Sequence, residues 1–191
     1  MPATERIGDA RKIVVYGATG AGKSVLAEEL GRLVGVPATS VDDICWSPGW
    51  VPMPPDEQIA HFDALTSTDA WVLDSAYGSW RHLAHERADL VVALDYARLT
   101  SLARLLRRTV TRIVDHREIC NGNYESWRTI FARDSLVMWH VTSFRRKRAE
   151  MRAWEAAASG PPVVRLRRPR HARAFVRAET ALRQTAGEPP S

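Results

Sequence analysis

The sequence contains little cysteine, little lysine and no long apolar segment. Its two cysteines, Cys45 and Cys120, lie far apart and lack the spacing of metal ligands, so we expect reduced thiols rather than a disulfide framework or a zinc site. No apolar run approaches the roughly 20 residues that a membrane-spanning helix needs, and the first residues lack the apolar core of a signal peptide. We therefore expect a cytoplasmic protein that does not associate with membranes.

The positive charge of the chain comes almost entirely from arginine. Only Lys12, Lys23 and Lys147 are lysines among the 27 basic residues, and the net charge is +5 with a pI near 9.7. A basic balance favours polyanionic partners, either nucleotides or nucleic acid, and the planar guanidinium grips phosphate through two hydrogen bonds. A general arginine bias of the genome would raise the total in the same way, although it does not explain each cluster.

Residues 17–24 fit the pattern G-x-x-x-x-G-K-[ST] of a phosphate-binding P-loop. An apolar run at 12–16 precedes the first glycine and predicts a buried strand, and apolar residues at helical spacing follow until Gly35. In this context the backbone N–H groups converge at a helix N-terminus, where the peptide dipoles favour an anion. The alternative, a chance glycine turn, does not explain these flanks.

We therefore expect the P-loop to bind ATP with Mg²⁺. Lys23 would reach the β- and γ-phosphates, and the Ser24 hydroxyl would ligate the metal. The predicted nucleotide-binding residues of this segment are Gly17, Ala18, Thr19, Gly20, Ala21, Gly22, Lys23, Ser24 and Val25.

The whole chain of 191 residues has the length of one α/β domain. Near-continuous apolar runs predict five buried parallel strands at 12–16, 35–41, 70–74, 88–95 and 162–166. Helices are expected at 24–34, 56–67, 81–87, 98–114, 126–158 and 171–185. We expect a three-layer α/β/α P-loop fold resembling the nucleoside monophosphate kinases, with strand order 2-3-1-4-5. The predicted organisation is a core at 12–185, an acceptor-binding lid at 43–70, an ATP lid at 115–126 and a flexible tail at 186–191.

Carboxylates end three of the predicted strands. Asp74 follows an apolar run, which is the position of the carboxylate in a Walker-B strand. We expect it to help Ser24 hold Mg²⁺. Asp42 and Asp43 follow the second strand, at the sheet edge where α/β proteins bind ligands. One of the two would accept or orient the proton of an acceptor hydroxyl; the alternative is an Asx turn with a helix cap. Asp95 more simply caps the helix that follows it or hydrogen-bonds within the sheet.

Aromatic residues gather in the loops at the same predicted edge. The segment 44–55 is rich in proline and excludes a central strand. Its Trp46 and Trp50, together with Tyr77 and Trp80, offer flat faces on which a base or a sugar ring could stack. The alternative is that these rings pack the acceptor lid, and this is the simpler interpretation for Trp50 and Trp80.

The helix at 98–114 carries arginines on one side and an apolar stripe on the other. The arginines are Arg104, Arg108 and Arg112 with Arg107 beside them, and the stripe is Leu99, Leu102, Leu106, Val110 and Ile113. A polar turn at 115–123 follows and predicts a movable flap. Arg107, Arg108, Arg112 and Arg117 are candidates to neutralise charge on a transferred phosphoryl group. The alternative is a solvated basic face, which suits Arg104 best.

These segments together resemble the adenylate-kinase-like P-loop proteins of the DNA topology modulation (FlaR-related) group. The resemblance extends over residues 12–176, and its most specific part is the string Cys-Asn-Gly-Asn-Tyr-Glu-Ser-Trp at 120–127. It implies a kinase fold with two lids, in which Gly22, Lys23 and Ser24 are ligands of ATP and Mg²⁺. It also implies that Arg167 and Arg168 lie where such kinases hold the adenine. Many relatives have glycine where this chain has Ser75.

We therefore predict a kinase that transfers the γ-phosphoryl group of Mg·ATP to a small acceptor, with a nucleotide among the candidates. The predicted catalytic residues are Lys23, Asp42, Asp43, Arg108, Arg112 and Arg117, and the acceptor site contains Asp43, Trp46, Trp50 and Tyr77. One alternative is an ATPase associated with nucleic acid, although no helix-turn-helix, zinc-finger or RNA-recognition signature appears. Another is a regulatory nucleotide-binding protein without kinase activity. The chain would act as a monomer or a homodimer.

Overall fold

A five-stranded parallel sheet forms the centre of the molecule, and a computed structural model describes it for residues 6–127 and 136–187. The strands lie in the order β2-β5-β1-β6-β9 and all pair in parallel. Numbered among themselves along the chain, they have the predicted order 2-3-1-4-5. Their bounds are β1 Lys12–Gly17, β2 Ala38–Thr39, β5 Trp71–Leu73, β6 Leu90–Leu94 and β9 Val163–Leu166.

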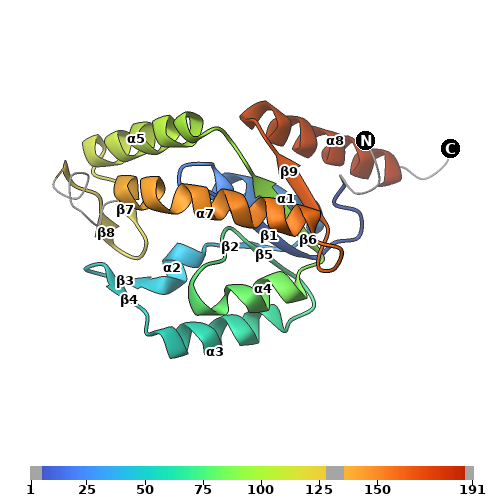
Figure 1. The fold of residues 1–191 in the computed structure, drawn as a ribbon, viewed down its shortest axis with the longest axis horizontal. Coiled ribbons are helices and arrows are strands. Elements are labelled where there is room, and N and C mark those ends of the chain that lie inside the picture. Colours follow the sequence, from blue (N-terminus) through green and yellow to red (C-terminus); the bar gives the residue numbers. More distant parts are fainter. Residues whose placement is uncertain (1–5, 128–135, 188–191) are drawn as a thin grey trace.

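Helices cover both faces of this sheet (Figure 1). One hydrophobic cluster packs α1 (Lys23–Val34) and α8 (Pro169–Gly187) against the sheet. A second cluster packs α3 (Pro55–Thr66), α4 (Arg81–Arg87) and α7 (Leu136–Ala156) on the other face. Successive strand residues alternate between the clusters, as Val91 and Val92 do, because neighbouring side chains of a strand point to opposite faces. The predicted three-layer α/β/α fold is confirmed.

Most predicted elements are present, with shifts at their ends. The first helix ends at Gly35, which adopts the left-handed conformation and donates its N–H to the carbonyl of Gly31. The helix predicted at 98–114 is α5, Arg98–Val114. The helix predicted at 126–158 corresponds to α7, and its residues 128–135 lie outside the described part of the chain, as do residues 188–191 of the predicted tail. Helix α8 continues to Gly187 and so includes the first two residues assigned to that tail.

Several short elements of the described part of the chain were not predicted, among them a 3-10 helix at Gly78–Trp80. Asp42 and Asp43 lie in a one-turn helix, α2 (Val41–Cys45), rather than in an Asx turn. Two small hairpins follow, β3–β4 (Trp46–Ser47 with Val51–Pro52) and β7–β8 (Glu118–Ile119 with Asn123–Tyr124). Each strand of these hairpins has two residues, which is too short for any periodicity to show.

The buried face of α5 coincides with its predicted apolar stripe only at Ile113. The helix buries Ser101, Leu105, Thr109 and Ile113, whereas Leu99 is 78% exposed and Val110 is 40% exposed. The reason is close packing against the P-loop, since a Cβ atom at Gly20 would collide with the carbonyl oxygen of Ser101 and the side chain of Leu105. The small side chain of Ser101 permits this approach, whereas Leu99, Leu106 and Val110 are exposed.

Within the residues that the structure describes, no helix combines the length and the apolar character needed to cross a bilayer.

Candidate active site

The P-loop lies between β1 and α1, and its backbone requires glycine at two points. Gly20 has φ +80° and Gly22 has φ +96°, in the left-handed region that other residues rarely adopt. A Cβ atom at Gly22 would also lie 2.9 Å from Nη2 of Arg104 on α5. The two glycines therefore allow the loop to turn into the N-terminus of α1, a 12-residue helix, where an anion is favoured. This geometry fits the phosphates of a nucleotide.

Ser24 and Asp74 meet directly at the end of the neighbouring strand. The Ser24 hydroxyl donates to Oδ2 of Asp74 at 2.5 Å, and the backbone N–H of Val41 donates to Oδ1 at 3.0 Å. Burial raises the pKa of the Asp74 carboxyl, and these two hydrogen bonds oppose the rise. A hydroxyl and a carboxylate are the oxygen donors that Mg²⁺ prefers. The two residues predicted to hold the metal therefore lie together, with chemistry that fits it.

The structure separates the roles of Asp42 and Asp43. Asp42 accepts a hydrogen bond from the Tyr77 hydroxyl at 3.0 Å, and its negative charge acts on Lys23. Burial lowers the pKa of the Lys23 ammonium, while Asp42 and Asp74 oppose this change. Asp43, by contrast, offers its backbone carbonyl to the Asn121 side chain. Of the pair, Asp42 is the carboxylate whose charge acts on the P-loop lysine.

Tyr77 and Cys45 complete the surroundings of Asp42. Burial raises the pKa of the Tyr77 hydroxyl, and the Asp42 charge adds to this rise. The pKa of the Cys45 thiol is also raised, chiefly by burial. Both groups therefore keep their protons near neutral pH, and Tyr77 remains a hydrogen-bond donor to Asp42.

The arginines of α5 and of the segment after it are divided between the site and solvent. Burial lowers the pKa of Arg108, whose charge acts on Lys23 and is favoured by Asp42 and Glu125. Arg112 forms an ion pair with buried Glu125 at 3.1 Å. Arg107 and Arg117 are exposed. The catalytic roles predicted for Arg108, Arg112 and Arg117 remain predictions.

Arg104, for which a solvated face was the favoured alternative, is exposed, and its guanidinium lies beside Gly22 of the P-loop. Of the two residues predicted to hold adenine, only Arg167 lines a groove. Arg168 is exposed, and Arg167 lines a groove beside Arg148 and Arg152 of α7.

A buried polar cluster on α7 was not predicted. The inward stripe of this helix contains Phe144, Lys147 and Met151, and the Lys147 side chain is 6% exposed. Burial lowers the pKa of Lys147 to about 7, and the nearby charge of Lys23 adds to this effect. Its signal in the sequence is a rare lysine at an inward position, between two apolar residues at helical spacing.

Glu150 extends this cluster on the same helix. It accepts hydrogen bonds from the Tyr16 hydroxyl at 2.5 Å and from Arg81 at 2.8 Å. Tyr16 belongs to β1 and Arg81 to α4, so Glu150 joins α7 to both. The cluster places charged and polar groups from three elements on the α7 face of the sheet, next to the P-loop lysine.

The two predicted lids contact each other through two asparagines. Asn121 donates to the backbone carbonyls of Asp43 and Trp46, the latter at 2.9 Å. Asn123 donates to the carbonyl of Ser47 at 3.0 Å and accepts the backbone N–H of Trp50 at 2.7 Å. The hairpin β7–β8 is therefore joined to the hairpin β3–β4, although about 75 residues separate them along the chain.

The aromatic residues divide between packing and the site. Trp80 is fully buried and stacks on Phe62, with ring centroids 3.7 Å apart, so its role is the packing of α3. Trp46 and Trp50 meet edge to face at 5.9 Å, directly after the helix that carries Asp42. The roles of Trp46, Trp50 and Tyr77 in binding an acceptor remain predictions.

The chain matches no protein-family model and no curated protein. Solved structures similar to it include a gluconokinase from Sinorhizobium meliloti 1021, at 17% identity and a TM-score of 0.49, over 93% of this chain and 98% of that chain. A sugar kinase from Janibacter sp. HTCC2649 aligns at 18% identity and a TM-score of 0.48, over 91% of this chain and 94% of that one. Deoxyadenosine kinase from M. mycoides aligns at 11% identity and a TM-score of 0.43, over 91% and 97%. Similarity at these levels identifies neither a family nor a substrate for this chain. The resemblance to the DNA topology modulation group stays a prediction.

Proposed function

We propose that this protein is a Mg·ATP-dependent kinase that phosphorylates a hydroxyl group of a small acceptor. The observation that supports it most strongly is the position of Asp42, a carboxylate that lies beside Tyr77 and whose charge acts on Lys23 of the P-loop. A nucleotide-binding protein without an acceptor has no need of a carboxylate at this point. In a kinase it accepts the proton of the attacking hydroxyl.

The phosphate side of the proposed reaction uses the P-loop and its neighbours. The loop backbone and Lys23 hold the β- and γ-phosphates, and Ser24 and Asp74 hold Mg²⁺, which neutralises charge on the phosphate oxygens. Arg108, which is half-buried, adds a second positive charge that acts on Lys23. Such positioning and electrostatic stabilisation supply most of the catalysis in phosphoryl transfer.

The acceptor side of the reaction centres on Asp42. The acceptor oxygen forms a bond to the γ-phosphorus, the bond from that phosphorus to the bridging oxygen breaks, and ADP leaves. The hydroxyl proton passes to Asp42, whose other contact is the Tyr77 hydroxyl. Tyr77 holds the carboxylate in place and keeps its own proton, because burial and Asp42 raise its pKa.

The joined hairpins fit a site from which water must be excluded. Asn121 and Asn123 link the hairpin after α2 to the hairpin after α5. Closure of these segments over the P-loop would suppress the transfer of phosphate to water. Trp46 and Trp50, which meet edge to face in the first of these hairpins, would supply aromatic surface for the acceptor.

Transfer from γ-labelled ATP to a panel of acceptors tests the proposal. The panel contains nucleosides, nucleoside monophosphates, sugars and sugar acids, each measured against hydrolysis without acceptor. We expect at least one class to raise ATP turnover well above hydrolysis and to carry the label. If ATP binds but no acceptor is labelled, the protein is a nucleotide-binding regulator or an ATPase.

A further inference from the structure

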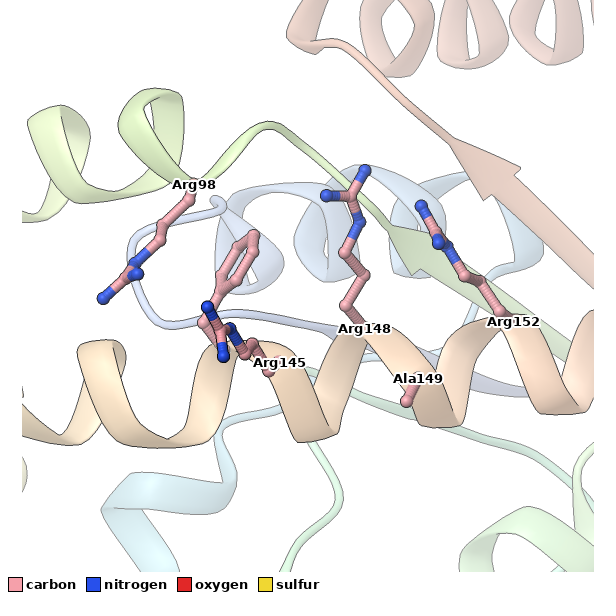
Figure 2. A pocket seen from close by; sticks show the side chains of 6 residues that line it. Arg98, Arg145, Arg148, Ala149 and Arg152 are labelled. Carbon is pink, nitrogen blue, oxygen red and sulfur yellow. The ribbon is translucent and has the colours of Figure 1, made fainter.

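A groove lined by arginines lies on the α7 side of the sheet. It consists of two adjoining hollows of about 380 and 630 Å³, which share Arg98, Arg148 and Arg152. Arg145, Arg148 and Arg152 project from α7, and Arg98 projects from the start of α5 (Figure 2). The larger hollow is completed by Asp95 directly after β6, Arg165 in β9, Arg167 directly after β9, and Glu155 near the end of α7.

The groove lies apart from the phosphate site that the P-loop provides. Its lining includes Asp95 and Arg165. Each follows by two residues a strand residue that faces α7, Ala93 and Val163 respectively, so each lies on the same face of the sheet. Arg104, in contrast, lies over the P-loop beside Gly22, on α5. In the described part of the chain, the lining includes no P-loop residue, and Arg167 is its only member that we had predicted to bind ATP.

The positive charge of the groove exceeds what its carboxylates neutralise. Buried Asp95 lies 2.8 Å from Arg148, 3.0 Å from Arg165 and 3.8 Å from Arg152. Arg165 also pairs with Glu155 at 2.6 Å, so carboxylates of the protein itself neutralise its charge. Six arginines thus face two carboxylates, a surplus of four positive charges.

The arginines at the rim supply that surplus. Among the described residues, Arg98, Arg145 and Arg167 have no carboxylate within ion-pair distance. Arg148 and Arg152 share a single carboxylate, and their side chains are 39% and 54% exposed. Like charges gathered around one hollow repel each other unless an anion lies among them.

We propose that this groove binds a small compound with several phosphate groups. Guanidinium groups hold phosphate oxygens through paired hydrogen bonds, and several of them around one hollow suit a ligand with more than one phosphate. The volume is that of a small-molecule site, and buried Asp95 holds Arg148 and Arg165 in place beside it. An extended nucleic acid strand is less suited, because its phosphates need cations along an open surface rather than around a hollow.

Titration with tripolyphosphate, followed by calorimetry, tests this proposal. Because the P-loop also binds polyphosphate, the measurement uses Lys23→Met, which removes the P-loop cation. We expect this variant to retain tripolyphosphate binding. Adding Arg98→Gln and Arg145→Gln, neither of which contacts Asp95, should weaken this binding roughly tenfold or more. Arg148→Gln with Arg152→Gln should do the same.

Arg32→Gln with Arg177→Gln, at exposed positions of α1 and α8, is the matched control and should change the affinity less than about twofold. The proposal is overturned if Lys23→Met alone abolishes binding, or if the groove variants bind tripolyphosphate as well as their parent. It is also overturned if tripolyphosphate does not bind while a dT oligonucleotide binds through the same arginines. In that case the groove is a nucleic acid site. None of these results depends on an acceptor being found for the proposed kinase.

Discussion

The hydroxyl of Ser24 donates a hydrogen bond of 2.5 Å to the carboxylate of Asp74, and this contact joins the first turn of α1 to the end of β5. The two residues are 50 positions apart in sequence, yet they meet because β5 pairs with β1, the strand that leads into the P-loop. The same carboxylate receives the N–H of Val41 at the start of α2, the helix of Asp42. Asp74 thus holds the predicted metal site and the predicted acceptor site in a fixed relation.

Asp74→Asn should weaken the effect of Mg²⁺ on nucleotide binding. The amide retains the shape of the side chain but not its charge, and loss of a group that orients a metal ligand costs roughly 10–100-fold in metal affinity. The measurement is ATP affinity by calorimetry with Mg²⁺ and with EDTA. An unchanged ratio of the two affinities in the variant would show that Asp74 plays no part in metal binding.

Asp42→Asn should slow phosphoryl transfer to the acceptor by roughly 10²–10⁴-fold, the contribution typical of a general base. ATP affinity should change little, because the P-loop remains intact. Asp43→Asn is the matched control, since the contact of Asp43 with Asn121 uses the backbone carbonyl. Equal losses in the two variants would contradict the distinction that the structure draws between these neighbours.

Lys147 should make stability depend on pH between about pH 7 and 8.5. Its pKa is lowered from 10.5 to about 7 in the folded protein, so above pH 7 the unfolded chain binds more protons than the folded one. The free energy of unfolding should therefore rise with pH in this window, by up to about 1.4 kcal/mol per pH unit.

Urea unfolding of the wild type and Lys147→Met at pH 7, 7.5, 8 and 8.5 checks this slope. The variant removes the buried amine, so its free energy of unfolding should rise less steeply than that of the wild type. Lys12→Met, at the start of β1, is the control and should keep the wild-type slope. Parallel curves for the wild type and Lys147→Met would rule out the buried amine as the source. Above pH 8.5 groups such as Cys120, whose pKa is raised to about 12, act in the opposite direction.

Asn123→Ala should release the contact between the two hairpins. The side chain accepts the N–H of Trp50 and donates to the carbonyls of Ser47 and Cys120, the latter at 2.5 Å. At about 1 kcal/mol for each hydrogen bond, the loss should speed amide hydrogen exchange at 46–52 and 118–124 by roughly tenfold or more. Mass spectrometry of peptides from these segments gives the measurement. Tyr124→Ala alters the exposed neighbour and serves as the control. Equal exchange in the two variants would mean that the hydrogen bonds of Asn123 do not stabilise the hairpins.

Sequence patterns were sufficient where structure depends on neighbours along the chain. The P-loop, its flanking strand and helix, and the five strands of the sheet followed from local spacing, and the strand order followed from the usual topology of such folds. The two hairpins were missed because each of their strands has only two residues, too few to show a period. The stripe on α5 was found, but its orientation was not, because a helical period does not say which face a neighbouring loop approaches.

The sequence by itself determined that residues 17–24 form a glycine-rich loop between a strand and a helix, since each step depends on residues close together in the chain. Only the tertiary structure decided that the charge of Asp42 rather than that of Asp43 acts on Lys23, and that Asn121 and Asn123 join the two hairpins. It also decided that arginines from α5, α7 and the end of β9 surround one groove. These relations connect segments that are distant in the chain, and packing against the common sheet brings them together.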